Sequence, residues 1–226
     1  MSQIKERHSR NIGAVTEEEM MKIYSSRVLV VGCGGLGGNN IEQLARMGVG
    51  FLRVVDGDTF AESNLNRQIL SSSGNIGYSK AAAAKERVHS IDPDIEVEAV
   101  CEFFTEENAA TLMADVDIVI DALDNVESRL LLEDCAAKAG LYIVHGAIRA
   151  WDLQVMLVPP GSGLLHSLYT IPQEKTVSPS LPMTPAACAS LQSAVAVRFL
   201  TGYASPLEGR LLISSISDMS LDIIEL

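Results

Sequence analysis

Residues 28–37 read Val-Leu-Val-Val-Gly-Cys-Gly-Gly-Leu-Gly, a short apolar run that leads directly into a glycine-rich turn. An apolar run without alternation is typical of a strand buried on both faces of a parallel sheet. The apolar residues between Asn39 and Met47 recur at helical spacing, which predicts a helix packed on that sheet. Phe51 to Asp56 is predicted to be a second strand, and it ends in an acid. The stretch therefore predicts a strand, a turn, a helix and a second strand in succession.

The glycines of this turn predict a nucleotide site. Glycine lets the backbone approach a ligand closely, and the free N–H groups at the start of a helix attract phosphate. Asp56, at the end of the second strand, can accept hydrogen bonds from ribose hydroxyls. Because the turn lies between a strand and a helix and an acid follows, the pattern favours a nucleotide site over a tight turn without a ligand. The glycines concerned are Gly32, Gly34, Gly35 and Gly37.

Cationic residues beyond the acidic strand indicate which nucleotide binds. Arg67 lies within Asn64-Leu65-Asn66-Arg67-Gln68, and Lys80 follows shortly after. A nicotinamide site has no evident use for these two cations, whereas a triphosphate does. A guanidinium can bind phosphate oxygens in a bidentate manner, and a lysine acts as a point charge. An isolated Arg or Lys is usually a solvated surface residue, so the prediction rests on the place of Arg67 and Lys80 after the motif.

A resemblance to the ThiF/MoeB/HesA family, the bacterial relatives of the ubiquitin-activating enzymes, now follows from the motifs. It covers nearly the whole chain in order, and the sequence Asn-Leu-Asn-Arg-Gln after the acidic strand is specific to this group. The matching segments are Arg7-His8-Ser9-Arg10-Asn11, Gly32-x-Gly34-Gly35-Leu36-Gly37, Gly48-Val49-Gly50, Asp56-x-Asp58, Ser63 to Gln68, Ile76-Gly77-x-x-Lys80, Asp124-Asn125 with Arg129, and Gly146-Ala147.

The resemblance implies ATP-dependent adenylation of a C-terminal glycine carboxylate, with release of pyrophosphate. The implied substrate is a small ubiquitin-like sulfur-carrier protein that ends in Gly-Gly, and the implied cofactors are ATP and Mg²⁺. The residues that would act on the phosphates are Arg10, Asn64, Arg67, Lys80 and Asp124. The residues that would hold the nucleotide are Gly32, Gly34, Gly35, Gly37, Asp56, Asp58, Gln68 and Asn125.

Asp124 and Asn125 follow a strand predicted at Val116 to Asp121. In an open α/β sheet ligands bind at the carboxyl ends of the strands, and a carboxylate is an oxygen ligand for Mg²⁺. Asp124 is therefore predicted to hold the metal. An Asp-Asn pair is also a common helix cap, and Val126 to Ala139 is predicted to be a helix, so capping alone remains the alternative.

The lone His145 is expected to be a polar wall residue rather than a catalyst.

The first eleven residues are charged and polar, which on composition predicts a loose arm. In the family, the arginine that matches Arg10 reaches across a two-fold dimer into the nucleotide site of the partner. The resemblance therefore implies a homodimer, with an arm that becomes ordered only in that dimer.

Thr16-Glu17-Glu18-Glu19 predicts the capped start of a helix that ends near Tyr24.

The second half of the chain has a different pattern. Strands are expected at 153–158, 210–217 and 221–226 and a helix at 187–200, so the sheet should continue antiparallel and offer a surface to a partner. The stretch 159–185 is rich in Pro, Ser, Gly and Thr, which predicts a long mobile loop. In the family a comparable segment crosses over the active site.

The predicted fold class is α/β, a Rossmann-like, mostly parallel sheet with helices on both faces that continues into antiparallel strands. One adenylation domain is expected over residues 1–226. Its expected parts are an N-terminal arm and helix at 1–25, a nucleotide-binding half at 26–150, and a partner-binding half at 151–226 with the crossover loop at about 159–185.

Composition excludes several other classes of protein. The chain carries a net charge of −12, so general nucleic-acid binding is not expected. Neither a signal peptide nor a membrane span is evident, which predicts a cytoplasmic enzyme. Four scattered cysteines without a Cys-x-x-Cys pair argue against a disulfide framework.

Two departures from the family concern cysteine. Many members bind structural zinc through two Cys-x-x-Cys pairs, but here the first region reads Leu164-Leu165-His166-Ser167-Leu168 and the sequence stops at Leu226, so no zinc site is expected. The expected loop also lacks the cysteine that some members use for thioester or persulfide chemistry. Cys188 falls in the following helix and is expected to be a small buried hydrophobe.

Three alternatives remain open at this point. The first is an NAD-binding oxidoreductase. The second is a non-catalytic adaptor that binds a ubiquitin-like protein without turnover, which the missing loop cysteine favours. The third keeps the adenylation chemistry but changes the acceptor to a peptide or a tRNA base.

Overall fold

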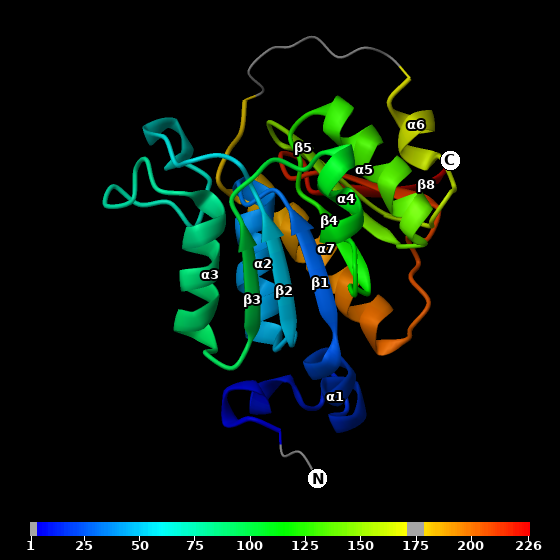
Figure 1. The fold of residues 1–226 in the computed structure, drawn as a ribbon. Helices are drawn as coiled ribbons and strands as arrows, with labels where there is room; N and C mark the ends of the chain where they lie inside the picture. The colour runs from blue at the N-terminus through cyan, green and yellow to red at the C-terminus, as the bar shows by residue number, and fades with distance from the viewer. Residues whose placement is uncertain (1–3, 171–178) are drawn as a thin grey trace.

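The computed structural model describes residues 4–170 and 179–226, which form one mixed sheet with helices on both faces (Figure 1). Its strand order is β3-β2-β1-β4-β5-β6-β7-β8. Strands β1 to β5 run parallel, and β6, β7 and β8 each pair antiparallel with the preceding strand. This arrangement confirms the predicted fold class. The strands are β1 (Arg27–Val31), β2 (Phe51–Val55), β3 (Glu96–Val100), β4 (Ile118–Asp121), β5 (Ile143–Arg149), β6 (Asp152–Val158), β7 (Arg210–Ser215) and β8 (Ser220–Glu225).

Helices cover the two faces of the sheet as separate layers, which can be followed in Figure 1. On one face α1, α2, α3 and α7 share a core, and on the other face α4, α5 and α6 share a second core. Val28 and Val30 point into the first core, whereas Leu29 and Val31 point into the second, so β1 is buried on both faces as its apolar run predicts. The helices are η1 (Glu6–Asn11), α1 (Glu17–Ser25), α2 (Gly35–Met47), η2 (Glu62–Asn64), α3 (Lys80–Ile91), α4 (Glu106–Leu112), α5 (Val126–Ala139), α6 (Leu164–Leu168) and α7 (Met183–Thr201).

Helix α2 begins earlier than its apolar spacing predicts. The sequence places the start at Asn39, but the helix begins at Gly35, so several glycines lie within its first turn. A Cβ atom on Gly37 would lie 1.7 Å from the carbonyl oxygen of Gly32, which no side chain can tolerate. The glycine at 37 is therefore required for the close packing of the helix on the preceding turn.

The N-terminal arm contradicts the expectation that it becomes ordered only in a dimer. Lys5 Nζ lies 3.3 Å from a carboxylate oxygen of Asp92, and Arg7 pairs with the same fully buried carboxylate. His8 is buried and bonds the hydroxyl of Tyr24 through Nδ1 at 2.9 Å. Long-range ion pairs within one chain thus anchor η1, and composition alone cannot reveal them.

The predicted crossover loop also contains regular structure. Part of it, residues 171–178, lies outside the described residues, but α6 forms within the first part and α7 begins at Met183 rather than at 187. The carboxylate of Glu133 accepts hydrogen bonds from the backbone N–H groups of Leu165 and His166, both at 3.0 Å, which fixes the start of α6. Pro185 lies within the first turn of α7, where a missing N–H costs little.

Gln192 joins α7 to the centre of the sheet. Its fully buried side-chain nitrogen donates to the carbonyl oxygens of Asp121 at 2.8 Å and Val144 at 3.0 Å. Its side-chain oxygen accepts from Asn40 of α2 at 2.9 Å. A Cβ atom on Gly146 would lie 2.4 Å from the Gln192 side chain, so only glycine leaves room for this amide. The glycine at position 146 is thereby explained by packing.

Replacing Gln192 with Ala should destabilise the fold, because two buried carbonyl groups lose a donor. We expect the free energy of unfolding to fall by at least about 2 kcal/mol, measured by urea denaturation. Gln43→Ala is the matched control, since Gln43 makes an exposed hydrogen bond to Ser190 across the same pair of helices. The control should change stability by less than about 0.5 kcal/mol. Equal effects of the two substitutions would contradict the assignment of Gln192.

Candidate nucleotide site

The predicted nucleotide residues converge at the carboxyl ends of three neighbouring strands. Val31, the last residue of β1, is paired with Val55 on β2 and with Asp121 on β4. The glycine turn after β1, the acid after β2 and the acid-containing turn after β4 therefore emerge side by side. This edge of the sheet is where open α/β folds bind their ligands.

The glycine turn has two kinds of glycine. Gly32 has a φ of +97°, and a Cβ atom there would lie 2.6 Å from the carbonyl oxygen of Ala122, so the protein itself requires glycine. At Gly34 and Gly35 a Cβ atom would meet its nearest neighbours at 3.4 Å, an ordinary contact. Since the fold does not demand glycine at these two positions, a ligand that approaches the backbone closely is the better reason for them.

Asp56 holds the glycine turn in place. Its two carboxylate oxygens accept hydrogen bonds from the backbone N–H groups of Cys33 at 2.7 Å and Asp58 at 2.8 Å. Burial raises the pKa of Asp56, and these two hydrogen bonds oppose that rise. A carboxylate can accept about four hydrogen bonds, so Asp56 retains acceptor capacity for ligand hydroxyls.

Lys80 begins helix α3 and points toward Asp58. Its Nζ lies 2.9 Å from Asp58 Oδ2, and the Lys80 side chain is only 9% exposed, against 53% for Asp58. Ser79 accepts a hydrogen bond from the N–H of Ala82 and so caps the helix just before the lysine. Asp58, predicted to contact the nucleotide, is here the partner of Lys80, and the pair presents one buried cation at the edge of the site.

Arg67 and its neighbours lie beside the glycine turn. Its guanidinium donates to the carbonyl of Ser63 and to the side chain of Asn66, both at 2.9 Å, and its Cγ would lie 3.8 Å from a Cβ atom on Gly35. The Asn66 side chain also donates to the carbonyl of Ser180 at 3.0 Å. Sequence reasoning missed this last contact because the two residues are far apart in the chain.

Asn64 and Gln68 differ in how their polar atoms are used. The Asn64 side-chain oxygen accepts from the N–H of Ala61 at 3.0 Å, which leaves its amide nitrogen for another partner. Gln68 is only 6% exposed, and its Oε1 has no hydrogen-bond partner among the described residues. A buried acceptor without a donor is costly, and the Nε2 atom of the same side chain would lie 3.4 Å from a Cβ atom on Gly34, so Gln68 is packed against the glycine turn.

Asn125, rather than Asp124, caps the helix after β4. Its side-chain oxygen accepts from the N–H of Ser128 at 2.9 Å, at the start of α5. Asp124 is exposed and accepts one long hydrogen bond of 3.4 Å from the Asn125 side chain. Most of the Asp124 carboxylate is therefore open to a ligand. No group of three or more His, Cys, Asp or Glu suited to a metal occurs in the described part of the chain, so oxygens of water and of a bound phosphate group would have to complete a Mg²⁺ site at Asp124.

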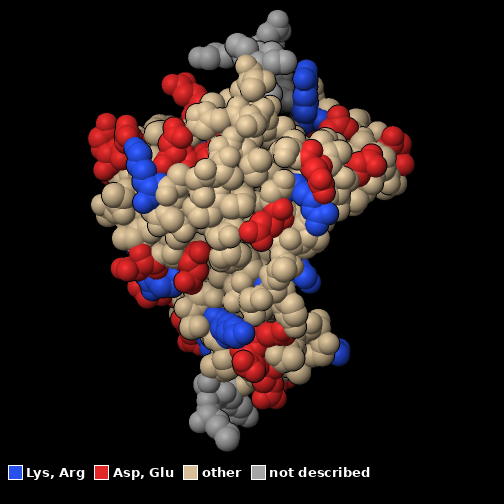
Figure 2. Space-filling model, turned by 90° about the vertical axis from the view of Figure 1, so that its right-hand side faces the viewer, with Lys and Arg blue, Asp and Glu red and all other residues tan. Residues whose placement is uncertain are grey.

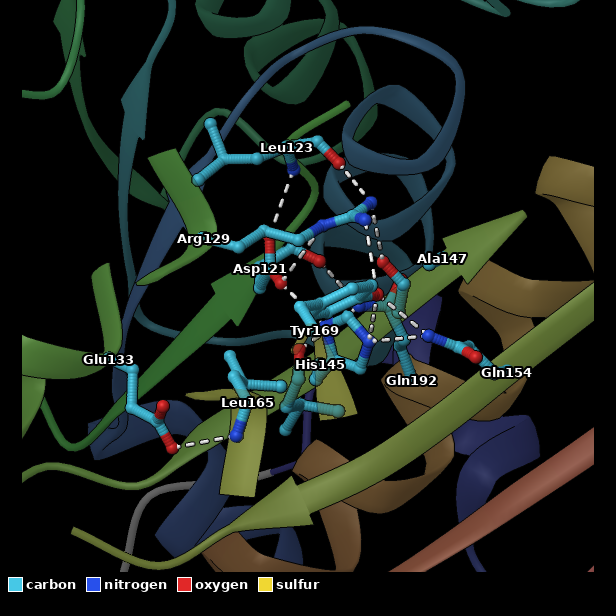
Figure 3. A network of polar contacts seen from close by, with 12 residues as sticks. Asp121, Leu123, Arg129, Glu133, His145, Ala147, Gln154, Leu165, Tyr169 and Gln192 are labelled. Carbon is cyan, nitrogen blue, oxygen red and sulfur yellow. Dashed lines mark hydrogen bonds and ion pairs between the residues drawn. The ribbon is translucent and has the colours of Figure 1, made fainter. Parts of the chain in front are cut away.

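His145 is a fully buried member of a polar network and not a wall residue of the site (Figure 3). Its Nδ1 lies 2.7 Å from Asp121 Oδ2, and its Nε2 lies 3.1 Å from the hydroxyl of Tyr169. Burial lowers the pKa of His145. The sequence offered no signal for this network, because Asp121, His145 and Tyr169 are brought together only by the fold.

Arg10 is not brought to the other predicted residues within one chain. It belongs to η1, next to α1 at the end of the sheet where β1 begins (Figure 1). His8 of the same segment lies against Gly48, before the start of β2, which places η1 opposite the glycine turn. A site that includes Arg10 therefore needs a second chain.

Positive charge near the site is local. On the face drawn in Figure 2, basic side chains are scattered among acidic ones. The chain carries a net charge of −12, so positive charge at this edge of the sheet has to come from individual groups such as Arg67 and Lys80. None of the helices in the described residues is long and apolar enough to cross a membrane.

Cys188 is fully buried in α7, as predicted. Its thiol lies near the carbonyl oxygens of Ala147 and Gln154, and burial raises its pKa to about 12. A thiol with such a pKa is not a nucleophile near neutral pH.

Known proteins resemble this chain in sequence and in fold. The ThiF family model matches residues 8–226. The chain is 35% identical to the SAMP-activating enzyme E1 of Haloferax volcanii, over 96% of this chain and 83% of that protein. It is 35% identical to the sulfur carrier protein adenylyltransferase of Thermus thermophilus, over 88% of this chain and 78% of that protein.

Other similar proteins are longer. The chain is 34% identical to the probable adenylyltransferase/sulfurtransferase MoeZ of Mycobacterium tuberculosis over 88% of its own length, but it spans only 54% of MoeZ. Among solved structures, E. coli MccB superposes with a TM-score of 0.85 at 18% identity, over all of this chain and 70% of that chain. The structural match shows a shared fold, and the sequence matches show that the chain and these relatives are homologous. The chain belongs to the ThiF family of adenylyltransferases.

Proposed function

We propose that this chain uses ATP to adenylate the C-terminal glycine carboxylate of a small ubiquitin-like sulfur-carrier protein, with release of pyrophosphate. The observation that carries the proposal is the convergence of a glycine turn, an acid, two cations and an open carboxylate at one sheet edge. The names of the relatives from Haloferax volcanii and Thermus thermophilus, which refer to SAMP and to a sulfur carrier, support the carrier as substrate.

The reaction needs positioning and charge rather than a general base. A C-terminal carboxylate has a pKa of about 3.5, so it is ionised at neutral pH and can attack the α-phosphorus of ATP directly. The bond from the α-phosphorus to the bridging oxygen breaks, and pyrophosphate leaves with the electron pair. The site must reduce the repulsion between carboxylate and triphosphate and stabilise the leaving group.

Different residues of this chain would bind the ribose, the phosphates and the metal, according to where they lie in the site. The free acceptor capacity of Asp56 suits the ribose hydroxyls, and the open backbone at Gly34 and Gly35 suits the phosphates at the start of α2. Arg67, beside Gly35, and Lys80, paired with Asp58, would hold the phosphates that leave as pyrophosphate. Asp124 would hold Mg²⁺, which supplies further positive charge on the phosphates.

Further polar groups complete the proposed nucleotide site. The free amide nitrogen of Asn64 can donate to a phosphate, and the unpaired buried oxygen of Gln68 can accept from the nucleotide. Asp58 orients Lys80 through their ion pair, and Asn125 orients the turn that carries Asp124 through its cap on α5.

We also propose that residues 1–226 form one adenylation domain that acts as a homodimer. Residues 26–150 would bind the nucleotide, and residues 151–226 would bind the carrier, with the segment at 159–185 crossing over the site. The position of η1, at the far end of the sheet from the glycine turn, supports a role for Arg10 in the site of the other subunit.

Removing either phosphate-binding cation should abolish adenylation without unfolding the chain. We expect Arg67→Ala and Lys80→Ala each to slow ATP–pyrophosphate exchange at least a hundredfold, or about 3 kcal/mol of transition-state stabilisation. Lys138→Ala is the control, because Lys138 forms an exposed ion pair with Glu106. Melting temperatures would check the fold. Normal exchange by both site variants would refute the phosphate assignment.

Mixing two inactive variants should restore activity if Arg10 acts across a dimer. Arg10→Ala and Asp124→Ala chains would each be inactive alone, but a heterodimer contains one complete site. With random assembly, about a quarter of wild-type exchange should return. Heterodimers purified with two different affinity tags that show no exchange would indicate a site built within one chain.

A further inference from the structure

A buried polar network contacts Leu123, the residue before Asp124 (Figure 3). Its members come from β4, α5, β5 and β6 and from the residue that follows α6. Asp121 and His145 are fully buried, and Arg129 is only 7% exposed. These residues are Asp121, Arg129, His145, Gln154 and Tyr169.

Two of these residues hold the backbone next to Asp124. The N–H of Leu123 donates to Asp121 Oδ1 at 3.0 Å, and the carbonyl of Leu123 accepts from the Arg129 guanidinium at 2.6 Å. The preceding residue, Ala122, donates its N–H to the carbonyl of Val31 at 3.0 Å. Both backbone polar groups of Leu123, the residue before Asp124, are thus held by the network, and the turn is tied to β1.

Tyr169 in turn holds Arg129. The guanidinium donates to the Tyr169 hydroxyl at 3.1 Å and lies 5.5 Å from the centre of the Tyr169 ring. The Nε atom of Arg129 lies 3.6 Å from Asp121 and has no hydrogen-bond partner among the described residues. The hydroxyl of Tyr169 is therefore one of few groups that set the orientation of the guanidinium plane.

The hydroxyl of Tyr169 has a defined direction of hydrogen bonding. Burial lowers the pKa of His145, and its Nδ1 lies 2.7 Å from Asp121 Oδ2, a carboxylate oxygen to which only a protonated ring nitrogen can donate. With the ring proton on Nδ1, Nε2 accepts from the Tyr169 hydroxyl at 3.1 Å, and the Gln154 side-chain nitrogen lies at the same distance from Nε2. The oxygen of Tyr169 remains free to accept from Arg129 and from the side chain of Gln154 at 2.7 Å. In this arrangement each hydrogen bond of the Tyr169 hydroxyl joins a donor to an acceptor.

We propose that Tyr169 is a positioning residue for Asp124. Its hydroxyl holds Arg129 against the carbonyl of Leu123, and so fixes the Asp124 carboxylate opposite the glycine turn. Tyr169 does not itself contact the nucleotide. The inference rests on the proposed function only in that the ligand of Asp124 is taken to be ATP with a divalent cation.

The substitution Tyr169→Phe tests this by removing only the hydroxyl. ATP affinity is measured by calorimetry, once with Mg²⁺ and once with EDTA. We expect binding to weaken about tenfold with Mg²⁺, as for other residues that orient a metal ligand, and to stay unchanged with EDTA. In an Asp124→Asn background the substitution should have no further effect.

Tyr142→Phe is the matched control. Its hydroxyl donates to Glu208 at 3.1 Å on the exposed surface, so its loss should leave ATP affinity unchanged under both conditions. Melting curves of each variant report on the fold independently of the ligand.

Three results would overturn the inference. They are no loss of affinity in Tyr169→Phe with Mg²⁺, an equal loss with EDTA, and the same loss in the Asp124→Asn background. The proposed function is tested separately, because a chain that shows the expected binding pattern but exchanges no pyrophosphate would refute adenylation and leave the role of Tyr169 standing.

Discussion

The close contact between the glycine turn and the end of β4 governs where every other part of the site can lie. Gly32 is pressed against the carbonyl of Ala122, and Gly37 is pressed against the carbonyl of Gly32. No side chain fits at either point, so α2 packs directly on the turn and its N-terminus opens onto the sheet edge. The same contact sets the distance from the turn to the segment that carries Asp124. Asp56 secures the opposite side through the N–H groups of Cys33 and Asp58.

Beneath this edge lies a buried polar network in which Asp121, Arg129 and His145 lie close together. A buried carboxylate without a partner would be strongly destabilising, but Asp121 is matched by His145 and by the nearby Arg129. Gln192 adds a neutral bridge from α7 to β4 and β5. A rigid polar base of this kind restricts the turn above it to one conformation, which suits a site that works by positioning. Asp124, above this network, has an exposed carboxylate with one long hydrogen bond, and Gln68 keeps a buried acceptor without a partner among the described residues.

Features encoded by neighbouring residues could be predicted from the sequence, whereas features that depend on the fold could not. The run at 28–31 and the helix at 126–139 have strong local patterns, and the structure places both where they were predicted. The candidate phosphate residues lie in contiguous motifs, which is why they could be named in advance. The family match also removes the oxidoreductase alternative that the glycine motif alone left open.

The errors have physical causes at long range. The arm was predicted to be loose because its anchor, Asp92, lies more than eighty residues away. Helix α6 was hidden in a stretch rich in loop residues because Glu133 fixes it from another helix. His145 was placed at the wall because nothing beside it in the sequence indicates Asp121 or Tyr169 as partners.

Adenylation of a carrier is tested most directly by ATP–pyrophosphate exchange with the purified protein and Mg²⁺. The assay would compare the protein alone with the protein plus each small ubiquitin-like protein ending in Gly-Gly from the same cell. We expect exchange that depends on one of these carriers. Binding of ATP without exchange in the presence of any carrier would contradict the proposed reaction.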